Sequence, residues 1–308
     1  MDKQKLWGIL KVVLKIGFTA ALLYLVSLKI DFKVVKELFL KSNLGYIFLA
    51  FAIYYLSQIV SSWRSLSLLK AIGLDLKFGF NFRLYLLGMF YNITLPGGVG
   101  GDGYKIYILR KKFKLPTKRI FLAMLFDRMS GLWAIGMIAV SLIIFIPKID
   151  IPKTWPFIAL VAGTLVYYLL MRRFFPDYSK KFFTVHAKAA LVQSLQVLVV
   201  IMILLSQNFD GKFSPYLFSF LLSTLAANVP VSFAGVGARE YVMTHASTYF
   251  GMDQNLAVFL SVAFFLLSTL AALSGVWFVY FSREFEAAPS SKEAHDFEEK
   301  ADEAAVGR

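Results

Sequence analysis

The chain has 308 residues, of which 58% are hydrophobic and 17% aromatic, and its formal net charge at pH 7 is +14. This apolar content excludes an ordinary soluble domain and is typical of a polytopic membrane protein. Cysteine is absent, which excludes disulfides, thiolate metal ligands and cysteine nucleophiles. The three histidines have no ligand-like spacing, so we expect neither a metal nor another cofactor.

Six stretches are apolar enough to cross a bilayer as helices, since a span needs roughly 20 mostly apolar residues. They cover about residues 9–29, 44–63, 120–146, 156–171, 187–206 and 256–281. Two further stretches, 84–95 and 215–229, end in loops rich in Pro and Gly. At about 1.5 Å per residue, the first of these reaches only to mid-bilayer. We therefore expect neither to span, and we expect the amphipathic segment 31–41 to lie along the outer interface.

The basic residues predict the topology of the two short stretches. Lys and Arg flank 84–95 on both sides, whereas 215–229 has few charged neighbours. Because basic residues collect in cytoplasmic loops, we predict a re-entrant helical hairpin from the inside and a second from the outside. This all-α arrangement of six spans and two hairpins puts 21 Lys and Arg in inner segments and 7 in outer loops. Both termini are then cytoplasmic. We interpret the basic excess as topology rather than as a nucleic-acid surface.

Two similar heptapeptides indicate an internal repeat. GVGGDGY at 98–104 returns 137 positions later as GVGAREY at 235–241. With three spans per half, the second copy is inverted, and repeats of this kind are typical of transport sites. We predict one integral membrane domain, 1–286, with repeats at about 5–146 and 150–283. An acidic tail, 287–308, is expected to be disordered in the cytoplasm.

The two glycine loops are the predicted substrate-binding site. Irregular backbone at membrane depth is tolerated only where it is buried in protein or lines a wet cavity, and a helix N-terminus after such a loop favours a phosphate. The alternative is that the glycines only pack a tight turn. The candidate residues are Asn92, Gly97, Gly98, Gly100, Gly101, Asp102, Asp127, Arg128, Asn228, Gly235, Gly237, Arg239 and Glu240. We assign no catalytic residue and no metal ligand.

Asp102 and Arg239 occupy equivalent positions in the two repeats. Either they pair with each other, or Arg239 holds a lipid phosphate while Asp102 caps its own helix. Glu240 is a proton or ion site, an arginine partner or a cap. We interpret Arg64, at the end of an apolar stretch, as an interface anchor. His245 is a proton relay or a polar residue satisfied by packing.

The loop motifs carry a resemblance to a known family. With NITLPGGVGG at 92–101 and NVPVSFAGVGARE at 228–240, the chain resembles the lysylphosphatidylglycerol synthetase transmembrane family. This is the flippase-like N-terminal region of the bacterial multiple peptide resistance factor. The segment 232–234, Ser-Phe-Ala, departs from the Pro-Gly-rich second loop of the family.

The resemblance implies a function in lipid movement. In full-length relatives a soluble C-terminal domain attaches lysine to phosphatidylglycerol, and the membrane region moves the product to the outer leaflet. Because little follows the last predicted span, we expect translocation rather than aminoacyl transfer. The expected partner is a phospholipid or polyprenyl-phosphate lipid of the bacterial inner membrane, and a homo-oligomer is compatible with this. The alternatives are a membrane enzyme for aminoacyl or glycosyl transfer to lipid-linked substrates, its accessory subunit, or a non-transporting scaffold.

Overall fold

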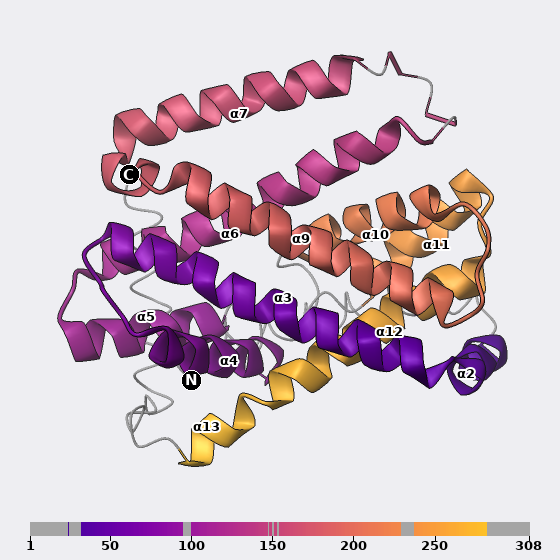
Figure 1. Ribbon diagram of the computed structural model, residues 1–308, viewed down its shortest axis with the longest axis horizontal. Coiled ribbons are helices and arrows are strands. Elements are labelled where there is room, and N and C mark those ends of the chain that lie inside the picture. Colours follow the sequence, from indigo (N-terminus) through magenta and orange to yellow (C-terminus); the bar gives the residue numbers. More distant parts are fainter. Residues whose placement is uncertain are drawn as a thin grey trace, which may run out of the picture.

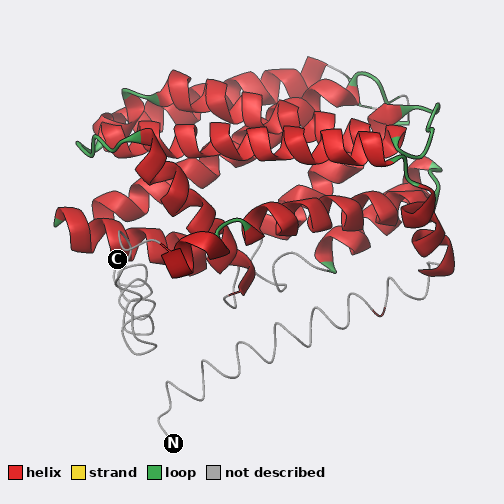
Figure 2. Ribbon diagram, turned by 60° about the horizontal axis from the view of Figure 1, so that its bottom comes forward, coloured by secondary structure: helices red, strands yellow, loops and turns green. Residues whose placement is uncertain are grey.

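The computed structural model describes residue 24 and residues 32–94, 100–146, 148–149, 151–152, 154–228 and 237–281. Within these ranges the regular elements are helices and none is a strand (Figure 2), which confirms the all-α class. The predicted first span, apart from residue 24, and the acidic tail lie outside the described residues.

The described helices follow one another through short connections. They are α2 (Phe32–Lys41), α3 (Leu44–Ala71), α4 (Phe78–Thr94), α5 (Gly100–Phe113), α6 (Thr117–Ile143), α7 (Thr154–Phe174), α8 (Pro176–Ser179), α9 (Phe182–Leu205), α10 (Phe213–Asn228), α11 (Ala238–Phe250), α12 (Gln254–Leu273) and α13 (Val276–Phe281).

Side-chain caps set the start of two of the long helices. Asn43 precedes α3 and accepts a hydrogen bond from the N–H of Gly45 at 2.9 Å. Asp253 precedes α12 and accepts one from the N–H of Leu256 at 2.8 Å. Each cap satisfies a backbone N–H that the first turn of the helix leaves unpaired. The start of each helix is therefore determined by neighbouring residues in the sequence, and the apolar run that follows continues as helix.

Five membrane-spanning candidates are present among the described residues: α3, α6, α7, α9, and α12 continued by α13. They coincide with five of the six predicted spans and are long and apolar enough to cross a membrane, as expected for a multi-pass membrane protein. The predicted end of the second span at residue 63 is wrong, because α3 continues to Ala71 with Arg64 and the following turns buried against protein.

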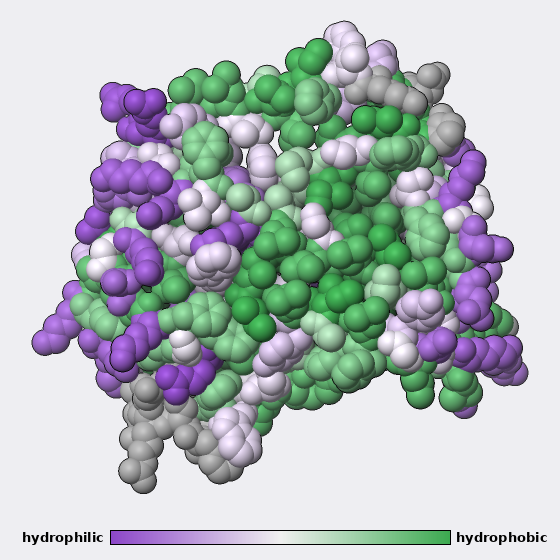
Figure 3. Space-filling view, viewed as in Figure 1, coloured by the Kyte–Doolittle hydropathy of each residue, from purple (hydrophilic) through white to green (hydrophobic). Residues whose placement is uncertain are grey.

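The surface has the polarity expected for a protein in a bilayer. Figure 3 shows an apolar middle between two hydrophilic ends. Almost all of α7 faces outward, with exposed apolar side chains such as Phe157, Leu165 and Leu169. A continuous exposed apolar surface of this kind marks contact with lipid or with another apolar surface.

The two halves of the chain repeat the same order of helices. The first residues of α3 and α9 are 138 positions apart, those of α4 and α10 135, those of α5 and α11 138, and those of α6 and α12 137. The equivalent helices α3 and α9 run antiparallel (Figure 1) and form the most extensive helix contact in the described fold.

Each half also contains a pair of shorter helices that pack against each other. They are α4 with α5 and α10 with α11, and the two pairs lie at opposite ends of the long axis (Figure 1). The segments between their helices, 95–99 and 229–236, are outside the described residues. The positions of these two pairs determine where the charged side chains in the first turns of α5 and α11 lie.

Candidate functional site

A polar stripe runs along the inner face of α3. Ser57, Ser61 and Ser65 recur every four residues and are at most 3% exposed, and Gln58 is buried beside them. Residues four apart lie on one face of a helix, so this face is directed into the protein. An apolar membrane helix with a buried polar face indicates an internal polar region.

Helix α4 supplies hydrogen-bond partners for this stripe. The Asn81 Nδ2 donates to the carbonyl oxygen of Ser62 at 2.7 Å and to its hydroxyl at 2.9 Å. The Tyr85 hydroxyl donates to Gln58 Oε1 at 3.3 Å. Because unpaired polar groups are costly in a low-dielectric interior, these bonds hold the α4–α5 pair against α3.

Two glycines let α4 and α5 approach closely. A Cβ on Gly101 would overlap the carbonyl group of Gly88, so only glycine fits at that contact. The N–H of Gly101 donates to Asn92 Oδ1 at 2.8 Å. This bond satisfies one of the free N–H groups at the start of α5 and fixes the helix start that carries Asp102.

Asp102 binds two cations. Its Oδ2 accepts from Arg128 Nε of α6 at 2.6 Å, and its Oδ1 accepts from Lys105 Nζ at 3.2 Å. The Lys105 ammonium also lies 4.6 Å from the centre of the Tyr85 ring. The side chains of Lys105 and Asp102 are 9% and 18% exposed, so these charges are largely shielded from solvent and depend on each other.

Arg64 and Asp127 form a second ion pair beside the first. Arg64 Nε and Nη2 donate to Asp127 Oδ1 and Oδ2 at 2.8 and 3.0 Å. Arg64 is 8% exposed, so the interpretation of this residue as an interface anchor is wrong: its charge is matched inside the protein. We call Arg64, Asp102, Lys105, Asp127 and Arg128 the ionic network, which has three positive and two negative charges.

Glu240 stabilises the start of α11. Its Oε2 accepts from the N–H of Gly237 at 2.7 Å, and its Oε1 accepts from the Ser261 hydroxyl of α12 at 2.8 Å. Gly237 has φ of +82°, a conformation that favours glycine. Of the three roles considered for Glu240, capping is therefore the one the structure shows.

Arg239 lies at the same helix start but has no comparable partner. Its Nε and Nη1 are buried and have no hydrogen-bond partner in the described part of the chain. Its guanidinium carbon lies 5.6 Å from the centre of the Phe264 ring. Across the described ranges Arg239 forms no ion pair within 4.0 Å, and its charge interacts with Glu240 and Tyr54 only at longer range. Asp102 and Arg239 do not pair, because Asp102 binds Arg128 and Lys105 instead.

Tyr54 connects the surroundings of Arg239 to the ionic network. This α3 residue is 6% exposed, its ring is 5.4 Å from that of Phe264, and it interacts electrostatically with both Arg239 and Tyr85. Tyr85 in turn lies within electrostatic range of Lys105. Polar side chains thus follow one another through the core from one helix pair to the other.

The structure separates the predicted site residues into two groups. Asn92, Gly100, Gly101, Asp102, Asp127 and Arg128 lie around the α5 start, and Gly237, Arg239 and Glu240 lie at the α11 start. Asn228 donates to the Thr224 carbonyl oxygen of its own helix, so it does not reproduce the bridging bond of Asn92. Gly97, Gly98 and Gly235 lie outside the described residues.

Four residues of this region were missed in the sequence: Tyr54, Gln58, Tyr85 and Lys105. Lys105 was counted only among the basic topology residues. The signal for Tyr54 and Gln58 was the polar stripe of α3, which is visible as polar residues inside a predicted span. Tyr85 lies on α4 and had no such signal. His245 is exposed, and its Nδ1 contacts the carbonyl oxygen of Tyr241 in its own helix.

The fold and the buried charges define a polytopic helical membrane protein with an internal polar region. The chain belongs to the family described as lysylphosphatidylglycerol synthase TM region, whose model matches residues 12–275. This confirms the resemblance seen in the loop motifs, and it is consistent with a lipid-related function in a membrane.

The chain is also similar to an archaeal protein. It shares 29% identity over 118 residues with the UPF0104 membrane protein MJ1595 of Methanocaldococcus jannaschii. The match covers 38% of this chain and 34% of the relative, so the chain spans about a third of the length of that protein.

Proposed function

We propose that this protein moves a phosphate-bearing or anionic lipid between the leaflets of the bacterial inner membrane. In this proposal the chain has six spans with both termini in the cytoplasm. The pairs α4–α5 and α10–α11 are re-entrant hairpins from opposite sides. Their location at opposite ends of the long axis supports this arrangement, as does the apolar band between the hydrophilic ends (Figure 3).

The observation that carries the proposal is the state of Arg239. A buried guanidinium without a carboxylate partner is costly, and its planar donors match a phosphate. The Nε and Nη1 of Arg239 have no partner in the described residues. Arg239 also lies in the first turn of the 13-residue helix α11, where the helix dipole favours an anion. A lipid phosphate would satisfy both the guanidinium and the helix start.

The ionic network supplies a second position for the same phosphate. It brings three basic side chains together, and the Arg128 side chain is 35% exposed. A phosphate could therefore bind Arg128 and Lys105 in exchange for Asp102. Tyr54 interacts electrostatically with Arg239 and with Tyr85, and in this proposal its hydroxyl donates to an anion that passes from one position to the other.

The alternative, an enzyme acting on lipid-linked substrates, would use a carboxylate as general base. Its candidates were Asp102, Asp127 and Glu240. Asp102 and Asp127 bind cations, and Glu240 binds a backbone N–H and a hydroxyl. A general base needs a carboxylate oxygen that is free to take a proton from the substrate, whereas both oxygens of each of these three groups already accept hydrogen bonds in the described structure. This supports transport over transfer chemistry.

The test is a translocation assay in liposomes that contain the purified full-length chain. Lipids with a fluorescent acyl chain and either an anionic or a zwitterionic head group are placed in one leaflet, and their arrival in the other is timed. We expect Arg239→Gln to slow movement of the anionic lipid at least tenfold. The matched control is Arg172→Gln, which removes an exposed arginine at the end of α7.

Equal rates for the parent and Arg239→Gln would show that Arg239 does not hold the substrate. Chemical conversion of a radiolabelled lipid by the parent, without translocation, would favour the enzyme instead. Thermal unfolding of the same preparations is the control for folding. A variant that unfolds at a lower temperature than the parent has a folding defect.

A further inference from the structure

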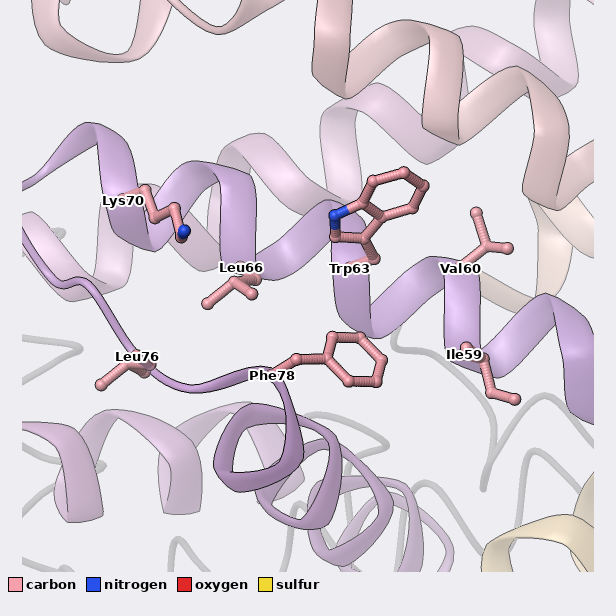
Figure 4. Close-up of a pocket in the computed structure, with 7 residues that line it drawn as sticks. All are labelled: Ile59, Val60, Trp63, Leu66, Lys70, Leu76 and Phe78. Atoms are coloured by element: carbon pink, nitrogen blue, oxygen red, sulfur yellow. The ribbon is translucent and has the colours of Figure 1, made fainter.

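An open groove lies on the outer face of α3, opposite the buried polar stripe. Its volume is about 360 Å³, and it is lined by Ile59, Val60, Trp63, Leu66, Lys70, Leu76 and Phe78. Figure 4 shows Trp63, Leu66 and Lys70 along α3, with Phe78 across the groove. The walls are apolar and one rim is basic, a combination that fits a ligand with a chain and a charged head.

Lys188 of α9 is not part of the lining, but its ammonium group contacts a lining residue, Trp63. Its Nζ lies 3.8 Å from the centre of the Trp63 ring and donates to the Ser67 hydroxyl at 2.7 Å. In the described ranges no carboxylate lies within 4.0 Å of it. Lys188 is in the second turn of a membrane span, where an uncompensated charge is costly unless an anion or the head-group layer receives it.

The charges near the groove are unbalanced. Lys188 interacts electrostatically with Lys70 and Lys181, both of which repel it. Lys70 pairs with Asp75 at 2.9 Å, but that carboxylate is 84% exposed. An ion pair so exposed to solvent contributes little to neutralising the charge of Lys70. The groove therefore attracts an anion, and its apolar floor requires that anion to carry a hydrocarbon chain.

We infer that this groove is a binding site for one anionic phospholipid of the surrounding bilayer. Lys70 and Lys188 bind the head-group phosphate, the indole of Trp63 lies at the depth of the ester groups, and an acyl chain packs along Ile59 and Phe78. Aromatic side chains favour this depth of the bilayer, and each nearby basic residue contributes about 1 kcal/mol to the attraction of anionic lipid, or about fivefold in affinity.

The groove and the buried ionic network share helix α3. Trp63 is 51% exposed and the next residue, Arg64, is 8% exposed, so α3 has the groove on one side and the network on the other. The inference rests on the proposed function in one respect: the bound lipid is taken to be the substrate before it moves inward.

The binding test uses Trp63 as a reporter in the full-length chain. The protein is reconstituted in phosphatidylcholine vesicles with small fractions of phosphatidylglycerol carrying brominated acyl chains, which quench nearby tryptophans. Subtracting the signal of Trp63→Phe isolates Trp63. We expect Trp63 to be quenched at a lower fraction of brominated phosphatidylglycerol than of brominated phosphatidylcholine.

Lysine variants then test the head-group contact. Each of Lys70→Gln and Lys188→Gln should reduce the preference for phosphatidylglycerol about fivefold. The double variant Lys70→Arg/Lys188→Arg should keep the preference for phosphatidylglycerol, because both positive charges remain. The matched control removes two exposed lysines at the opposite end, Lys36→Gln and Lys212→Gln, and should keep it too.

The inference is overturned if Trp63 is quenched equally by both lipids, or if the two glutamine variants keep the preference. It is also overturned if millimolar inorganic phosphate removes the preference, because the ligand would then be a free anion. Arg239→Gln separates the two proposals. It should keep the lipid preference of Trp63 while losing translocation, whereas a parent that binds but never translocates refutes only the proposed function.

Discussion

Arg64 and Asp127 form a two-bond ion pair between α3 and α6, with Nε to Oδ1 at 2.8 Å and Nη2 to Oδ2 at 3.0 Å. Their side chains are 9% and 13% exposed. This pair joins the second and third spans of the first half inside the protein, where neither charge has water to replace its partner.

Removal of one member of this pair should destabilise the protein more than removal of both. Arg64→Met leaves Asp127 buried and unpaired, and breaking such a pair typically lowers the free energy of unfolding by about 3–5 kcal/mol. The double variant Arg64→Met/Asp127→Leu should recover most of this loss. Thermal unfolding in detergent, arranged as a double-mutant cycle, measures the coupling. Additive losses would show that the pair is not a unit.

Gly101→Ala should separate α4 from α5. The added methyl group would overlap the carbonyl of Gly88, and relief of such overlap typically costs about 1–3 kcal/mol. Gly103→Ala is the matched control, since a Cβ there has no neighbour within 4 Å. It should be neutral or slightly stabilising. If both variants unfold at the same temperature, the close approach of these two helices does not limit stability.

Glu240→Ala should destabilise the start of α11, whereas Glu240→Gln should be tolerated. The alanine variant loses the bonds to the Gly237 N–H and the Ser261 hydroxyl, and loss of a helix cap costs about 0.5–2 kcal/mol. A glutamine keeps an oxygen that can accept from Gly237. Unfolding temperatures of the two variants decide this. Equal destabilisation would show that the charge of Glu240, rather than its geometry, is required.

Arg239→Met should stabilise the resting protein while it abolishes translocation. The guanidinium is buried without an ion pair in the described fold, so an apolar side chain of similar length removes a desolvation penalty. A gain of about 0.5–2 kcal/mol is typical when a functional residue that strains the fold is replaced. Unfolding and translocation are measured on one preparation. A loss of stability would mean that Arg239 has a structural partner.

The helix order was predictable because its determinants are local. Apolar runs of sufficient length, Pro and Gly at their ends, and caps such as Asn43 and Asp253 act over a few residues. Five predicted spans and the two short helix pairs follow from these signals. The end of α3 was not predictable in this way, because Arg64 has the sequence signature of an interface anchor and only its partner 63 positions later keeps it buried.

The residues of the candidate site were found in part. Asp102, Arg239 and Glu240 were marked by their positions after two similar loops, which the sequence displays directly. Their partners were not predictable. The equivalence of Asp102 and Arg239 suggested a pair, yet Asp102 binds Arg128 and Lys105, while Glu240 caps its own helix.

The amino-acid sequence alone therefore determined the membrane class, the helix order and the repeat, because bilayer thickness and helix periodicity constrain every residue of a run in the same way. Only the tertiary structure decided which buried charges are neutralised. Charge pairing depends on approaches of a few ångströms between helices far apart in the chain, such as that of Arg64 to Asp127. Helix packing sets these approaches. In the described structure it pairs Arg64 with Asp127 and leaves Arg239 without an ion pair.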